Sequence, residues 1–218
     1  MSITENIKSL LREIPPGVKM AAAAKTRTPA EVEEAIAAGL TIIGENYVQE
    51  GEAARGGVVL PAEWHFIGHL QKNKVKKAVA IFDLIETVDS LEMAWEIDKR
   101  CEQAGKTMPV FIEVNSGREP QKSGVMPEGA EALVRSISEL THVQIKGLMT
   151  MGPVGCGQDE LRACFRETKQ LLDYLGGLKI QGVAMKELSM GMTGSYRAAI
   201  EEGATLIRIG SLIFGERC

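Results

Sequence analysis

The chain has 218 residues, of which 44% are hydrophobic and 25% are charged, as in an ordinary soluble globular protein. This length suits a single domain, which we expect to span residues 1–218. The net charge of -4 gives no electrostatic basis for binding nucleic acid or an anionic membrane, and we expect neither as a partner. The sequence also contains no apolar stretch long enough to cross a bilayer.

The cysteines argue against a metal site. Cys101, Cys156, Cys164 and Cys218 are scattered, with no C-x-x-C pair and no histidine at metal-ligand spacing. Four free thiols in a chain of this size are typical of a reducing compartment. We therefore expect a cytoplasmic protein without a metal.

Strands and helices are predicted to alternate along the whole chain. A helix over residues 2–12 comes first and ends before Pro15-Pro16-Gly17. Eight short apolar runs follow as predicted strands: Val18–Ala24, Thr41–Gly44, Trp64–Gly68, Leu84–Val88, Val110–Val114, Val143–Met149, Glu187–Met190 and Leu206–Ile209. Helices are predicted after the first seven: from Thr28-Pro29 to about Ala38, from about Tyr47, over the lysine-rich segment, after Asp89-Ser90, and over about 127–140, 158–175 and 196–202.

Eight such units in this length predict an α/β fold, a single (β/α)8 TIM-type barrel with an extra N-terminal helix. A doubly wound sheet would need a glycine-rich dinucleotide fingerprint after its first strand. The segment there is Lys25-Thr26-Arg27-Thr28-Pro29, which lacks it. The barrel is therefore the favoured fold.

Polar residues follow most of the predicted strands. In barrels of this type, the residues that carry chemistry lie at the C-terminal ends of the strands. Those residues are Lys25, Asn46, His69, Asp89, Asn115, Thr150, Ser189 and Gly210-Ser211. We expect them to converge on one face as a functional site.

Lys25 is the candidate nucleophile. It follows the apolar run Met20–Ala24, where desolvation would make the amine reactive toward an aldehyde or ketone. A lysine at a strand end can instead extend its ammonium into solvent. Position alone does not decide between the two interpretations.

The last two strand ends indicate a phosphate site. Leu188–Ser195 runs from a strand into a helix and supplies hydroxyls, glycines and free N–H groups. Arg208–Gly215 follows the eighth strand, and loops after strands seven and eight are the usual phosphate site of a barrel. The glycines could alternatively serve only tight turns. A phosphate site beside a reactive lysine is what pyridoxal 5'-phosphate requires.

Arg208 lies within the eighth predicted strand. If Ile207 and Ile209 face outward, Arg208 points into the barrel, where an unpaired charge is costly. A pyridine nitrogen is a candidate partner, and an arginine beside it would leave that nitrogen unprotonated.

These residues resemble the pyridoxal phosphate homeostasis proteins, which have the barrel of the alanine racemase N-terminal domain. The similarity runs from Lys25 to Arg217. Its motifs are Lys25-Thr26, Gly44–Glu50, Trp64–Lys74, Val114-Asn115 with Glu119, Lys122 and Gly124, Gly147–Met149, Leu188–Met192, Arg208–Gly210 and Phe214–Arg217. The chain departs from the family at Ala24, where a hydroxyl residue is usual, and at Gly194-Ser195, where an acidic residue is common.

The resemblance implies that pyridoxal 5'-phosphate is bound as a Schiff base on Lys25, with Arg208 near the pyridine nitrogen. It implies further that Ser189, Gly210 and Ser211 hold the phosphate, with Met190 and Asn46 close to the ring. The expected function is cofactor homeostasis: binding, buffering or delivery of the cofactor, with apoenzymes that need it as recipients.

An amino-acid racemase or decarboxylase is the alternative function. Racemisation needs acid–base groups on both faces of the ring. Related racemases take the second group, a tyrosine, from an additional β-domain and a partner subunit, whereas this chain stops after the predicted barrel. We therefore expect no robust catalytic activity, and we expect a monomer. A Schiff-base aldolase is less favoured, because its lysine normally lies on a middle strand.

Two further residues have open roles. Lys122 is either an ordinary loop lysine or a second amine that relays an aldehyde to Lys25. His69 is either a ligand contact or a bystander at the barrel mouth. The basic run Lys72–Lys77 is interpreted as a solvated helix face, with a partner-docking surface as the alternative.

Overall fold

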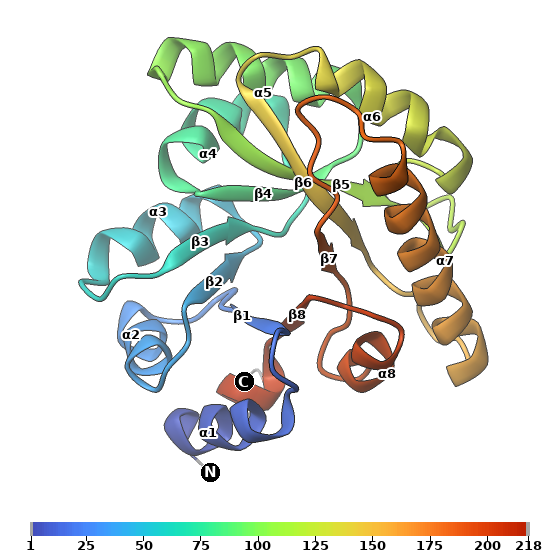
Figure 1. Cartoon of the computed structure of the whole chain (residues 1–218). Helices are drawn as coiled ribbons and strands as arrows, with labels where there is room; N and C mark the ends of the chain where they lie inside the picture. Colours follow the sequence, from blue (N-terminus) through green and yellow to red (C-terminus); the bar gives the residue numbers. More distant parts are fainter. Residues whose placement is uncertain (1, 217–218) are drawn as a thin grey trace.

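The computed structural model describes residues 2–216, which form a closed barrel of parallel strands in chain order (Figure 1). The strands are β1 (Lys19–Ala23), β2 (Ile42–Glu45), β3 (Glu63–Phe66), β4 (Leu84–Val88), β5 (Met108–Val114), β6 (Val143–Thr150), β7 (Glu187–Ser189) and β8 (Leu206–Ile209). Pairing of β1 with β8 closes the barrel and sets Ala21 beside Arg208. The predicted TIM-type barrel is confirmed. Arg217, the last residue of the final motif, and Cys218 lie outside the described residues.

Helices surround the barrel (Figure 1). They are α1 (Ile3–Glu13), α2 (Pro29–Ala37), α3 (Val48–Gly57), α4 (Val75–Ile81), α5 (Leu91–Ala104), α6 (Ala130–Ser138), α7 (Gln158–Gly177), α8 (Tyr196–Glu201) and α9 (Ser211–Phe214). Two 3-10 turns, η1 (Lys72–Lys74) and η2 (Pro127–Gly129), precede α4 and α6. The sequence predicts the first eight helices but not the short α9. Within residues 2–216, no helix combines the length and the apolar character needed to cross a membrane.

Local sequence explains where the helices begin. Thr28 accepts the Glu31 N–H, and the Glu31 carboxylate accepts the Thr28 N–H, which forms a capping box in front of Pro29. Ser90 accepts the N–H of Met93 at the start of α5, as predicted. These two caps begin α2 and α5 soon after β1 and β4, which keeps both connections short.

The barrel interior is a packed core. Side chains of one parity along each strand point inward and form a small apolar cluster: Ala21, Ile42, Leu84, Phe111, Met149 and Leu206. Side chains of the other parity pack against the helices in a much larger cluster. Residues of the inward parity that follow the ends of the strands therefore point toward the mouth of the barrel. Lys25, four residues after Ala21, is one of them.

Helix α1 connects the two ends of the described chain. It packs against α2 and α9 (Figure 1). The Asn6 amide donates to the Ile213 carbonyl at 3.0 Å. The Glu13 carboxylate accepts from the Tyr196 hydroxyl at 2.7 Å and from Arg197 at 2.6 Å. The extra helix thus covers the junction between the first and last units of the barrel.

Candidate cofactor site

A cavity of about 660 Å³ lies at the C-terminal ends of the strands, around the junction of β1 and β8. Five residues predicted for the site line it: Lys25, Asn46, Arg208, Gly210 and Ser211. Its other lining residues are Ala23, Arg27, Ile67, Met151, Met192, Thr193, Gly194, Gly215 and Glu216. The chain therefore brings an amine, a guanidinium and several hydroxyl and backbone groups to one cavity.

Lys25 lies two residues beyond the end of β1 and is partly buried. Its Nζ sits 4.8 Å from the centre of the Tyr47 ring, a cation–π distance. The next residue, Thr26, has a left-handed backbone with φ of 67°. Such a conformation is strained for a β-branched residue. The Glu50 carboxylate accepts the Thr26 N–H at 2.9 Å and so holds this turn beside Lys25.

The loops after β7 and β8 meet at the same cavity. The Ser211 hydroxyl donates to the Thr193 hydroxyl at 3.2 Å, which joins the two loops. Gly191 serves the turn itself, since its φ is +90° and a Cβ there would lie 2.5 Å from Ala199. Gly194 has open space around it. Thr193, Gly194, Gly210 and Ser211 together give hydroxyl and backbone N–H groups suited to a phosphate.

Arg208 points into the barrel, as the strand alternation predicts, and is 4% exposed. Its Nη1 donates to the Ser189 hydroxyl at 2.5 Å, and its Nη2 donates to the Thr150 carbonyl at 3.0 Å. Glu86 Oε2 lies 3.6 Å from Nη1. Burial lowers the pKa of Arg208 while Glu86 and Glu113 oppose that shift, and the guanidinium remains charged.

Glu86 connects Arg208 to a buried histidine. One carboxylate oxygen accepts from the Ser189 hydroxyl at 2.5 Å, and the other lies 2.7 Å from His65 Nδ1. Burial alone would raise the pKa of Glu86, but the hydrogen bond and charge of His65, with the charge of Arg208, hold that pKa below its ordinary value. Burial alone would lower the pKa of His65, but Glu63 and Glu86 raise it to about 9. The carboxylate therefore lies between two cations.

Two predicted site residues lie elsewhere. Ser189 is fully buried, and its hydroxyl bonds to Glu86 and Arg208 instead of lining the cavity. Met190 is also fully buried and belongs to the large apolar cluster outside the barrel, because it has the opposite strand parity. Neither residue lines the cavity: Met151 and Met192 are the methionines on its wall, and Thr193 supplies the hydroxyl of its loop.

A second cavity of about 240 Å³ adjoins the first and shares Asn46, Ile67 and Met151 with it. His69 and Lys122 line this second cavity. The Lys122 ammonium pairs with Glu119 and donates to the Gly152 carbonyl at 2.8 Å, which favours the ordinary loop role over the relay.

Glu113 lines the second cavity too. Burial, reinforced by the charge of Asp89, raises its pKa to about 7, while Arg208 acts in the opposite direction. The sequence analysis missed this carboxyl. It lies inside β5, one residue before the strand ends, whereas the predicted polar residues follow the strands.

Arg27 and Glu86 were missed as well. Arg27 follows Lys25 by two residues and lines the same cavity, with its guanidinium donating to the Gly215 carbonyl at 2.9 Å. Side chains alternate between inward and outward along β1, and the same alternation continued past its end predicts that Arg27 points inward, as Lys25 does. Glu86 could have been found from the sequence, because it is a charged residue in the apolar strand Leu84–Val88. A buried charge requires a partner.

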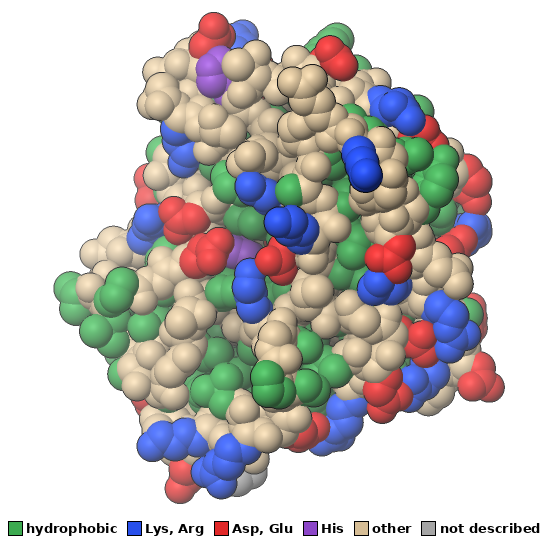
Figure 2. All heavy atoms as spheres, viewed as in Figure 1, with side chains coloured by type: hydrophobic (Ala, Val, Ile, Leu, Met, Phe, Trp, Pro, Cys, Tyr) green, Lys and Arg blue, Asp and Glu red, His purple; other side chains and the backbone are tan. Residues whose placement is uncertain are grey.

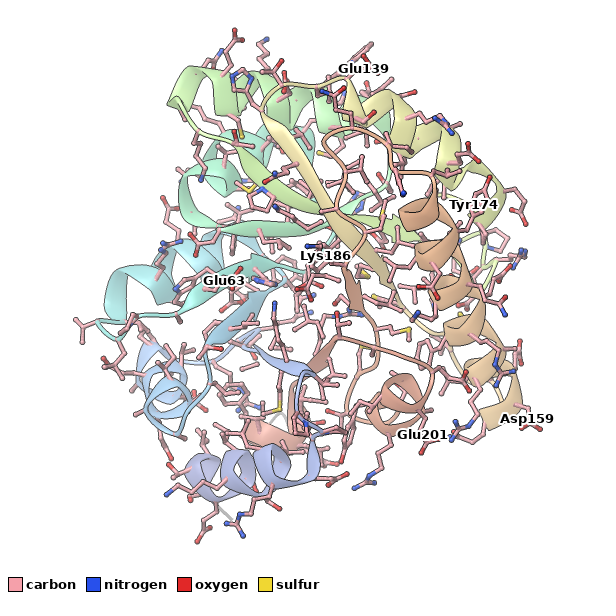
Figure 3. All side chains as sticks on the ribbon, in the orientation of Figure 1. Glu63, Glu139, Asp159, Tyr174, Lys186 and Glu201 are labelled. Carbon is pink, nitrogen blue, oxygen red and sulfur yellow. The ribbon has the colours of Figure 1, made fainter. Side chains whose placement is uncertain are left out.

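The opposite end of the barrel carries a third cavity, of about 290 Å³, lined by residues from the starts of the strands. Charged side chains of both signs and a histidine gather there near the middle of the face shown in Figure 2, where Figure 3 labels Glu63 and Lys186. His65 reaches this cavity with its Nε2, 3.2 Å from Glu63. The His65–Glu86–Ser189–Arg208 chain thus runs from one end of the barrel to the other.

The chain is similar to proteins of known name. A family model described as the alanine racemase N-terminal domain matches residues 1–218. The pyridoxal phosphate homeostasis protein of Aquifex aeolicus is 42% identical over 203 residues, which cover 91% of this chain and 87% of that protein.

Solved structures show the same likeness. PipY of Synechococcus elongatus with PLP bound superposes with a TM-score of 0.91 at 35% identity, over 98% of this chain and 100% of PipY. An alanine racemase of Clostridium difficile gives a TM-score of 0.79 at 16% identity, over 99% of this chain and 56% of the racemase. This second likeness concerns the fold alone.

Proposed function

Because the chain belongs to the alanine racemase N-terminal domain family and, within it, to the pyridoxal phosphate homeostasis proteins, we propose that it binds pyridoxal 5'-phosphate covalently through Lys25 and serves cofactor homeostasis. The observation that carries the proposal is the shared cavity. Lys25, Arg208 and the Thr193–Ser211 hydroxyl pair line one space at the barrel mouth. That donor set matches the aldehyde, the pyridine nitrogen and the phosphate of this cofactor.

Each part of the cavity has a distinct task. Lys25 Nζ would condense with the aldehyde, whose oxygen leaves as water, while the strained turn held by Glu50 fixes the backbone beside it. Arg208 would face the pyridine nitrogen. Thr193, Gly194, Gly210 and Ser211 would hold the phosphate.

Asn46 and Met192 line the same cavity, where they would contact the ring. When bound, the cofactor supplies an aldehyde that reacts with amines and a ring that can withdraw electrons.

We propose that this chain carries the cofactor and lacks a robust activity of its own. Arg208 cannot give a proton to the pyridine nitrogen readily, so the ring is a weak electron sink. The tyrosines also argue against racemisation. Tyr174 donates to Glu131 and Tyr196 donates to Glu13, both outside the barrel, whereas the Tyr47 ring lies beside Lys25 Nζ. None of the three supplies the second acid–base group.

The proposed partners follow from the carrier role. Apoenzymes that need the cofactor would be the recipients, and the protein would act as a monomer in the cytoplasm. In the described residues, Cys101, Cys156 and Cys164 are free thiols, which suits a reducing compartment.

The first experiment identifies the attachment site. We expect the purified protein, loaded with pyridoxal 5'-phosphate, to be yellow, and borohydride reduction followed by peptide mapping to place the label on Lys25. Lys25→Ala should be colourless and unlabelled. Lys122→Ala is the matched control and should keep full labelling, because that ammonium is already paired with Glu119. A label on another lysine would refute the proposal.

The second experiment separates a carrier from an enzyme. The loaded protein is incubated with amino acids in deuterated water, and exchange of the α-proton is followed by NMR. We expect exchange far slower than a racemase gives, together with transfer of the cofactor to an added apoenzyme. Rapid exchange would replace the carrier role with racemase activity.

A further inference from the structure

The Arg208 guanidinium bonds to buried groups of the barrel. Its Nη1 and Nη2 donate to Ser189 and to the Thr150 carbonyl, both of which are fully buried. A guanidinium has five N–H donors, so these two bonds leave others for a ligand in the cavity that Arg208 lines. The bonds to Ser189 and Thr150 therefore fix the orientation of the guanidinium, and they lie on its side away from the ligand.

Ser189 uses its hydroxyl fully in this arrangement. It accepts from Arg208 and donates to Glu86, each at 2.5 Å. The side chain is 0% exposed, whereas Ser211, on the next loop, is exposed at the cavity wall. The two serines thus face different parts of the site: Ser189 lies behind Arg208, and Ser211 lies where a phosphate would be held.

Glu86 supplies the charge that keeps this arrangement in place. It is 0% exposed and lies between the Arg208 guanidinium and the His65 ring, with His65 Nδ1 at 2.7 Å. A buried guanidinium without a carboxylate would be costly and would turn toward any other anion within reach, including a ligand phosphate. The carboxylate removes that tendency.

Building on the proposed function, we propose that Glu86 and Ser189 are positioning residues that fix Arg208 toward the pyridine side of the site, and that Ser189 plays no part in holding the phosphate. Their removal changes how the ring is held. The phosphate contacts, made by the loops that contain Thr193 and Ser211, remain.

The decisive test compares two ligands on two matched serine variants. Pyridoxal carries the ring and aldehyde of the cofactor but no phosphate. Ser211→Ala should lower the preference for pyridoxal 5'-phosphate over pyridoxal by about tenfold, the effect of losing one hydrogen bond to a charged group. Ser189→Ala should weaken both ligands by the same factor and shift the visible absorbance maximum of the bound cofactor. An equal loss of preference in Ser189→Ala would overturn the proposal.

Glu86→Gln tests the carboxylate with the same readouts. It should shift the absorbance maximum in the same direction as Ser189→Ala, and the double variant should add little to either single one. Glu45→Gln is the matched control, because it makes the same substitution at another buried carboxyl. Among residues 2–216, Glu45 is not one of the groups that bond to Arg208. If the absorbance shifts of the two single variants add up in the double variant, Glu86 and Ser189 do not act through the same residue, Arg208. If Glu86→Gln does not fold, Ser189→Ala decides.

A measurement without cofactor separates this inference from the proposed function. In NMR of the nitrogen-labelled, ligand-free protein, the Arg208 guanidinium, assigned with Arg208→Lys, should show distinct, slowly exchanging N–H signals. Ser189→Ala should merge them. Unchanged signals would contradict the positioning role even in a protein that loads normally, whereas failure of the wild type to load would contradict the proposed function alone.

Discussion

Strand alternation predicts the positions of some residues of the site but not of others. Alternation along β8 predicts that Arg208 points inward, and the end of β1 predicts Lys25 at the mouth; both line the cavity. Ser189 also has the inward parity, yet its hydroxyl bonds to Glu86, 103 positions away along the chain. No local pattern pairs residues so far apart, so the sequence cannot tell a ligand contact from a contact inside the protein.

Glu45 gives a prediction at this scale. It ends β2, is 1% exposed, and its Oε2 has no hydrogen-bond partner among the described residues. Burial, with a smaller contribution from the charge of Glu50, raises its pKa to about 8. A raised carboxyl pKa favours the folded state below about pH 4.5 and loses that contribution as the pH rises through 8.

Glu45→Gln should therefore raise the free energy of unfolding by on the order of 4 kcal/mol at pH 8 and change it little at pH 4.5. Urea titrations at the two pH values measure the difference. Glu139→Gln, at an exposed position (Figure 3), serves as the control and should change neither value appreciably. A gain of equal size at both pH values would contradict the assignment.

At the scale of elements, caps and apolar runs predict nearly the whole order of strands and helices. The exception is α9, whose four residues are too few for a helical pattern to appear in the sequence. Tertiary contacts hold it in place, among them the bond from Asn6 to the Ile213 carbonyl. The cavity wall around Ser211 therefore depends on α1, at the other end of the described chain.

The pairing of β6 with β7 depends on one close approach. A Cβ on Gly147 would lie 1.8 Å from the Glu187 carbonyl oxygen, and two residues further along Met149 pairs with Ser189. Gly147→Ala should lower the free energy of unfolding by at least about 3 kcal/mol, because backbone atoms would have to move. Gly177→Ala, at the end of α7 with nothing within 4 Å, should instead stabilise by about 0.5 kcal/mol. Thermal denaturation of both variants compares the two.

At the scale of the whole molecule, three buried groups make stability depend on pH in the same direction. The pKa of His65 is raised to about 9, that of Glu45 to about 8 and that of Glu113 to about 7. A raised pKa means that the folded state holds its proton more tightly than the unfolded chain does. Each contribution is complete below the ordinary pKa of its group and disappears as the pH rises through the shifted value.

We expect the free energy of unfolding to fall as the pH rises from about 6.5 to 9, with His65 accounting for on the order of 3 kcal/mol. Denaturant titrations across this range measure the slope. His65→Gln should be less stable at pH 6 but should lose much less stability between pH 8 and 9. An unchanged slope in that variant would show that Glu86 does not hold the proton on His65.

The closure of the barrel has a consequence for when the cofactor can be loaded. Lys25 follows the first strand, and Arg208, Gly210 and Ser211 come from the last strand and the segment after it, so the cavity forms only once β1 pairs with β8. A chain still emerging from the ribosome carries the lysine proposed to bind the cofactor before the proposed phosphate loops have been made. With the cofactor bound at this cavity as proposed, its capture would follow the pairing of β1 with β8, and the bound cofactor would link these two strands.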